Sequence, residues 1–124
     1  MKCVNMTILV GHIATNPKVI SDEPLGVKFR LATNERHFSK TKGNIISTSE
    51  FHTIKCWKQN AKFTMESLST GNIVLVIGKL HHHKYETNDG GTGVNSEIIA
   101  HTVVQLDRIP PDVRELLERH KINI

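Results

Sequence analysis

Hydrophobic and polar residues alternate along several short stretches of the chain, which is the pattern of half-buried β-strands. The alternation is clear in residues 4–8, 27–31 and 51–57, whereas residues 73–77 are apolar on both faces, as in a buried central strand. Clusters of Asn, Asp, Gly and Pro separate these stretches and indicate turns. We therefore predict five strands, near residues 3–13, 26–36, 45–57, 72–86 and 94–106.

One stretch has helical periodicity instead. Ala61, Met65 and Leu68 recur at i, i+4 and i+7 within residues 58–69, which predicts a short amphipathic helix that covers the core with its apolar face. Three strands, a helix and a final hairpin follow one another in the OB-fold, a five-stranded Greek-key barrel whose open face and loops bind oligonucleotides. The predicted fold class is therefore all-β with one short helix, an OB-fold.

The end of the chain changes character. Pro110 and Pro111 suit the start of a helix, and the apolar residues after them recur at helical spacing. We expect an OB-fold domain over residues 1–106 and a C-terminal extension over residues 107–124 that forms a short helix.

Length and composition restrict the class of protein. The chain has 124 residues, enough for one domain, and hydrophobic residues make up 38% of it. The longest apolar run has five residues, far too few to cross a membrane, and no secretory or transit signal is visible at the start. We expect an intracellular protein, cytoplasmic or nucleoid-associated, although an organellar or phage origin stays open.

The two cysteines and the charge balance bear on chemistry and partners. Cys3 and Cys56 lack CxxC spacing, so we expect reduced thiols and no thiolate metal site. The net charge is +4, with 16 Lys and Arg against 12 Asp and Glu. Residues 28–62 hold eight of the basic residues and only Glu35 and Glu50 as acids, a net charge of +6. This concentration indicates a polyanionic partner.

Two predicted strands carry the candidate binding chemistry. Alternation in residues 51–57 separates two faces, one with Phe51, Thr53, Lys55 and Trp57 and the other with His52, Ile54 and Cys56. A face that mixes aromatic rings with a lysine suits a groove in which bases stack and phosphates are neutralised. The structural alternative is a barrel wall with one lysine that extends to solvent.

In the fourth predicted strand, Lys79, His81, His83 and Tyr85 share a face, and Leu80, His82 and Lys84 share the other. A metal-dependent hydrolase that uses His81, His83 and His101 as zinc ligands is one alternative. No HExxH motif or neighbouring carboxylate in the sequence supports it, so we favour phosphate contacts for these histidines.

Six motifs occur in order along the chain: NMTILVGHI at 5–13, NP at 16–17, FRLATNER at 29–36, SEFH at 49–52, GNIVLVIGKL at 71–80 and KYE at 84–86. In these motifs the chain resembles the bacterial-type single-stranded DNA-binding protein family over residues 3–106. The resemblance implies an OB-fold homotetramer that coats single-stranded DNA without sequence preference in replication, recombination and repair. It implies neither catalysis nor a cofactor.

The resemblance also implies roles for individual residues. The family's stacking aromatics correspond to His37, Phe51, Trp57 and Tyr85, and its subunit interface to Asn5 and His52. Together with the charge pattern, it places DNA contacts at Arg36, Lys40, Lys42, Lys55, Lys58, His81, His83 and Lys84. Since imidazoles gain charge as pH falls from about 8 to about 6, His81 and His83 predict tighter DNA binding at the lower pH.

The C-terminus departs from the family pattern. It has neither the flexible Gly/Pro/Gln-rich linker nor the acidic tip on which the family's protein partners dock. We therefore do not expect partners that bind through such a tip. Three alternatives remain open: an OB-fold module for RNA or replication restart, the hydrolase described above, and a structural module that has lost the groove function.

Overall fold

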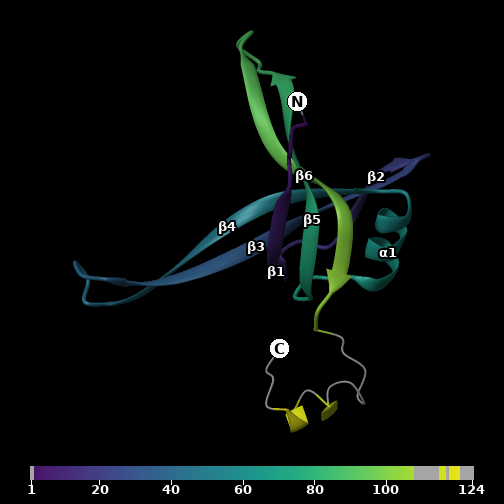
Figure 1. Cartoon of the computed structure of the whole chain (residues 1–124). Helices are drawn as coiled ribbons and strands as arrows, with labels where there is room; N and C mark the ends of the chain where they lie inside the picture. Colours follow the sequence, from purple (N-terminus) through teal and green to yellow (C-terminus); the bar gives the residue numbers. More distant parts are fainter. Residues whose placement is uncertain (1, 108–114, 117, 121–124) are drawn as a thin grey trace.

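Six strands and one helix form the fold in the computed structural model, which describes residues 2–107, 115, 116 and 118–120 (Figure 1). The elements are β1 (Thr7–Ile13), β2 (Lys18–Asp22), β3 (Leu25–Ser39), β4 (Asn44–Trp57), α1 (Gln59–Ser67), β5 (Ile73–Glu86) and β6 (Thr92–Gln105). The helix lies between β4 and β5, as predicted, and it is two residues shorter at the C-terminal end and one at the N-terminal end.

The strands pair in the order β1-β5-β6-β4-β3-β2, and β1 also pairs with β3. This last pairing joins His12 to Ala32 and Ile13 to Leu31, so five strands close into a barrel. All paired strands are antiparallel except β4 and β6, which run parallel over three residue pairs. The predicted all-β OB-fold with one short helix is confirmed.

The core of the barrel consists of side chains from alternate positions of the strands. Phe29, Leu31, Ile54, Val74 and Val76 are fully buried there, as the alternating pattern predicts. Cys56 also lies in the core as a free thiol, and burial raises its pKa to about 11. A thiol in this position serves as an apolar packing group.

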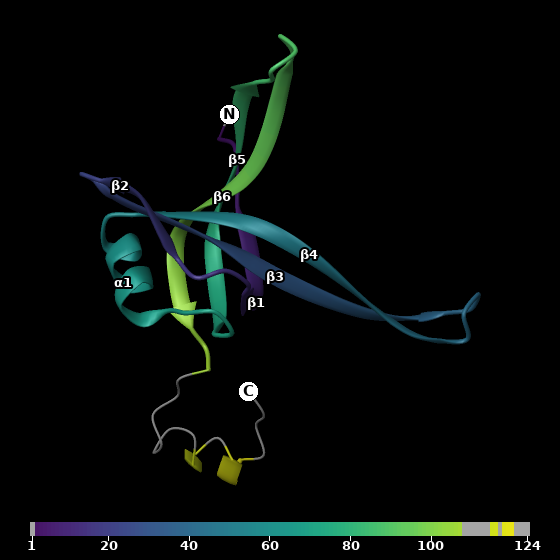
Figure 2. The same cartoon turned by 180° about the vertical axis from the view of Figure 1, so that it is seen from behind.

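Helix α1 covers one end of the barrel, on the side away from the β3–β4 hairpin (Figure 2). Its buried face consists of Ala61, Thr64 and Leu68 beyond its last turn, whereas Met65 is exposed. The prediction that Met65 faces the core is therefore wrong. Thr64 can take the buried position because its hydroxyl donates a hydrogen bond to the carbonyl oxygen of Asn60 at 2.7 Å.

Two long hairpins project from the barrel and diverge from each other (Figure 1). The β3–β4 arm consists of the ends of these strands around the turn at residues 40–43, and the β5–β6 arm ends at residues 87–91. The pairing of β5 with β6 shifts register between Ile77 and Gly78, opposite His101, where the barrel passes into the arm. Such a bulge bends and twists a strand, which suits this change of direction.

The strand predictions differ from the structure in two places. The β2 strand was not predicted because its five residues are mostly exposed, show no alternation, and pair only with one end of β3. The first strand begins at Thr7 and not near residue 3. Most of the C-terminal helix predicted in residues 107–124 falls on positions 108–114, 117 and 121–124, which lie outside the described residues. Among the described residues of this segment, the His120 amide donates to the Leu116 carbonyl at 3.3 Å.

Candidate nucleic-acid interface

One continuous face extends over β3, β4, β6 and β5, because the register of these strands brings alternate residues to the same side. We call this surface the groove face. It comprises Lys28, Arg30, Phe51, Thr53, Lys55, Trp57, His81, His83, Tyr85, Asn95 and Glu97. The prediction that Phe51, Thr53, Lys55 and Trp57 share a face is confirmed by their pairing with β3.

A cavity of about 390 Å³ lies on the groove face. Its lining is polar and consists of Lys28, Thr53, Lys55, His83, Asn95, Ser96 and Glu97. Lys28 and Lys55 are direct cross-strand partners, so two like charges lie side by side. Directly opposed like charges destabilise a sheet unless a counter-ion is near.

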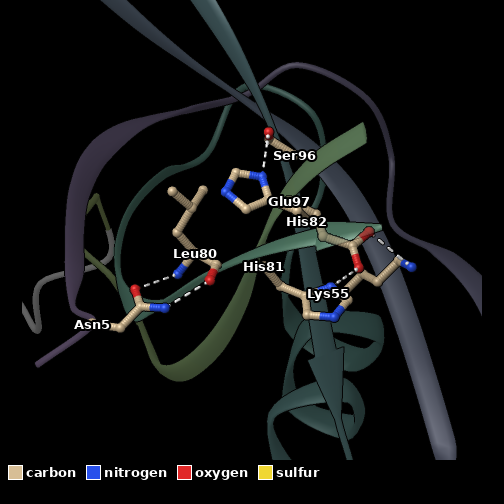
Figure 3. Close-up of polar contacts among 7 residues, drawn as sticks. All are labelled: Asn5, Lys55, Leu80, His81, His82, Ser96 and Glu97. Carbon is tan, nitrogen blue, oxygen red and sulfur yellow. Dashed lines mark hydrogen bonds and ion pairs between the residues drawn. The ribbon is translucent and has the colours of Figure 1, made fainter. Parts of the chain in front are cut away.

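Glu97 is that counter-ion (Figure 3). It is only 6% exposed, and its Oε2 lies 2.8 Å from Lys55 Nζ, while its Oε1 lies 3.0 Å from His81 Nδ1. Burial raises the pKa of this carboxyl, but the hydrogen bonds and charges of Lys55 and His81 outweigh it, so the pKa lies below the ordinary value. Glu97 is therefore ionised in the folded protein and holds two basic side chains of the groove face.

This arrangement predicts loss of stability in acid. A carboxyl whose pKa is lower in the folded than in the unfolded state stabilises the fold above its unfolded pKa, and the gain disappears as pH falls through the folded pKa. We expect the free energy of unfolding to decrease as the pH is lowered below about 4. Urea titrations at a series of pH values would measure this, and a Glu97→Gln variant should have a flatter profile; equal profiles would contradict the prediction.

The aromatic residues of the groove face differ in how freely their rings can be reached. Phe51 is 53% exposed, and the Arg30 guanidinium lies 5.3 Å from its ring centroid. Trp57 is half-buried against Gly26, and the exposed Tyr85 lies over Gly93. Phe51 is thus the ring best presented for stacking, next to a cation.

Other predicted DNA contacts lie on the two arms or beside the helix. Arg36, Lys40 and Lys42 are exposed on the β3–β4 arm, and Lys58 is exposed immediately before α1. His37 is exposed too, but the register pairs it with Ile46, which places it on the face opposite Phe51. Lys84 pairs with Val94, and its side chain lies on the other face of β5 from those of His83 and Tyr85. The roles proposed for these residues in DNA binding stay predictions.

The two residues predicted at a subunit interface have contacts within the chain. The Asn5 side chain donates from Nδ2 to the Leu80 carbonyl at 2.8 Å and accepts from the Leu80 amide at 3.0 Å (Figure 3). It thereby continues the β1–β5 ladder beyond Thr7. His52 is half-buried, and its Nε2 lies 2.9 Å from Thr33 Oγ1. Their role at an interface stays a prediction.

Sequence reasoning missed three residues of the groove face that carry charge: Lys28, Arg30 and Glu97. For Lys28 and Arg30 a signal was available, because both alternate with the apolar residues of residues 27–31 and must face away from the core. For Glu97 no local signal existed, since its contact with Lys55 depends on the parallel pairing of β4 and β6.

Two further expectations concern metals and membranes. Within residues 2–107, 115, 116 and 118–120, no three His, Cys, Asp or Glu side chains are grouped so that they could hold a metal ion. The zinc site considered at His81, His83 and His101 is thus not formed; His81 is instead bound to Glu97. Among the same described residues, no helix is both long and apolar enough to cross a membrane.

Comparison with known proteins adds to this geometry. The model of the single-strand binding protein family matches residues 4–106, which include the whole barrel and both arms. The chain belongs to this family.

Individual members of the family are similar over most of the chain. The single-stranded DNA-binding protein of Thermotoga maritima is 29% identical over 90% of this chain and 80% of its own length. The single-stranded DNA-binding protein 2 of Staphylococcus aureus is 32% identical over 84% of this chain and 73% of its own. Among solved structures, the Plasmodium falciparum SSB in complex with ssDNA has a TM-score of 0.76 and 28% identity over 86% of this chain and 98% of that one.

Proposed function

We propose that this protein binds single-stranded DNA with little sequence preference and coats it. The observation that carries the proposal is the groove face. There the exposed ring of Phe51 lies beside Arg30, and Lys28 and Lys55 line the cavity on the same face. Rings that stack on any base, together with cations that neutralise phosphates, are the chemistry of sequence-independent binding. Relatives named single-stranded DNA-binding proteins support it.

In this proposal the protein has no enzymatic activity and coats single-stranded DNA during replication, recombination and repair. Its place is the cytoplasm or the nucleoid, where such strands arise. The cations of the groove face and the β3–β4 arm carry much of the affinity, so binding weakens as salt rises.

We further propose that the working form is a homotetramer. An apolar stripe on β1 and the segment before it supports self-association: Val4, Met6, Ile8 and Val10 are all more than half exposed at alternate positions. Ile8 and Val10 pair with Ile77 and Leu75 of β5, which widens the stripe. Apolar patches of this kind mark interfaces between protein chains.

The proposal is tested by fluorescence anisotropy with a labelled long oligothymidine, in parallel with duplex DNA and RNA of equal length. We expect binding to the single-stranded DNA only, with log K falling linearly with log salt, and four chains per particle by light scattering. Equal or tighter binding of RNA would favour the RNA-module alternative, since the 2′-OH is the group that distinguishes the two. Absence of binding by a folded protein would refute the proposal.

Phe51→Ala should weaken binding of oligothymidine by about fivefold or more, because base stacking on a ring contributes about 1–3 kcal/mol. The salt dependence should stay the same, since no cation is lost. Phe63→Ala is a matched control, because Phe63 is a partly exposed phenylalanine on α1, away from the groove face. Equal affinities of the two variants would contradict the assignment of Phe51.

A further inference from the structure

The tip of the β3–β4 arm carries a pair of exposed apolar side chains. Phe38 is 63% exposed and Ile45 is 68% exposed, and the two are direct cross-strand partners, so they lie on the same face of the hairpin. The arm projects away from the barrel (Figures 1 and 2). An exposed apolar pair at the end of a projecting arm is a candidate contact surface.

The register connects this pair to the groove face. Counting along β3, Arg30, Arg36 and Phe38 lie on one side, and the β4 residues that pair with this side include Phe51 and Ile45. From the barrel to the tip, cations and rings therefore alternate on this face, in the order Arg30, Phe51, Arg36 and Phe38. His37, next in sequence, points to the other side.

We propose that Phe38, backed by Ile45, is a stacking platform for unpaired bases at the arm tip, which extends the path of DNA beyond the groove face. The proposal rests on the proposed function. Phe38 lies six residue pairs from Phe51 along the arm, about 20 Å at the rise of a β-strand. At a stacked rise of about 3.4 Å per base, this separation corresponds to about six bases.

The charge around the tip favours a nucleic acid over a second copy of this chain. Arg36, Lys40 and Lys42 lie close to the pair in the sequence and are exposed, and Glu35 is the nearest acid in the sequence. The arm belongs to residues 28–62, which carry a net charge of +6. Two such tips would repel each other, whereas the phosphates of a DNA strand would be attracted, and a ring flanked by cations suits a base flanked by phosphates.

The experiment compares Phe38→Ala, Phe38→Leu and Phe38→Trp in anisotropy titrations with a long oligothymidine at several salt concentrations. We expect alanine and leucine to weaken binding by about fivefold or more and tryptophan to retain it, because stacking needs a ring. The slope of log K against log salt should be unchanged in all three, since stacking releases no counter-ions. Phe63→Ala again serves as the control for loss of an exposed phenylalanine.

Three results would overturn the proposal. Unchanged affinity of the alanine variant would show that Phe38 does not contribute to DNA binding, and wild-type binding in the same titration would leave the proposed function intact. A leucine variant that binds as tightly as wild type would show that the ring does not stack. A lower particle mass of the alanine variant without DNA, by light scattering, would show that the tip contacts another copy of the chain.

Discussion

Replacing Glu97 with glutamine is expected to lower the free energy of unfolding by about 1–3 kcal/mol and to steepen the salt dependence of DNA binding. Removing one partner of a fully buried ion pair costs about 3–5 kcal/mol, because the other charge is left without a counter-ion. Here Lys55 and His81 keep some contact with water, which reduces the loss. Denaturation in urea measures the first effect.

The second effect follows from the freed Lys55. In the wild type its ammonium group lies 2.8 Å from Glu97, so a DNA phosphate must compete with that carboxylate. Without the carboxylate, one more phosphate contact should add about 0.7 to the slope of log K against log salt. Glu66→Gln, at an exposed position on α1, removes the same charge away from the groove face and should change neither quantity.

The two effects separate possible roles of Glu97. If the carboxylate only supports the fold, the variant is less stable, but its salt slope equals that of the wild type. If it also limits the affinity of the groove face, the slope steepens at salt concentrations at which the variant is folded. A variant as stable as the wild type would contradict the importance of the Lys55–Glu97 and His81–Glu97 pairs.

The groove face could largely be predicted from the sequence because strand alternation depends only on neighbouring residues. Phe51 and Lys55 share a face in any regular strand, and Ile54 and Cys56 must then face the core. The order of three strands, a helix and a hairpin predicted the barrel, and the family motifs added the roles of individual residues. The same alternation places His37 on the face of the sheet that does not carry Phe51, once the uninterrupted register of β3 with β4 is known.

Contacts between distant segments could not be predicted in this way. The pairing of Lys55 with Glu97 joins residues 42 positions apart and needs the parallel contact of β4 with β6. The helical periodicity in residues 58–69 was recognised, but it does not say which side is buried; Met65 is more hydrophobic than Thr64, yet Thr64 satisfies its hydroxyl within the helix and takes the buried place.

Gly11→Ala is expected to destabilise the protein by about 2–3 kcal/mol through the contact that closes the barrel. A Cβ atom at Gly11 would overlap the carbonyl oxygen of Ala32, which is main chain and cannot rotate away. This is where β1 meets β3: His12 pairs with Ala32, and the Ala14 amide donates to the Arg30 carbonyl at 2.8 Å. Relief of the overlap requires these strands to separate.

Gly93→Ala is the matched control, because it is the same change in another strand. There the added Cβ would meet only the end of the Tyr85 side chain, which can rotate away, so we expect a smaller loss. At an unobstructed strand position, alanine would instead stabilise by about 0.5–1 kcal/mol relative to glycine. Urea denaturation of both variants tests the difference, and faster hydrogen exchange of the Ala14 amide in Gly11→Ala would locate it at the closure. If Gly11→Ala were as stable as the wild type, β1 and β3 would have to be farther apart at Gly11 than the structure places them.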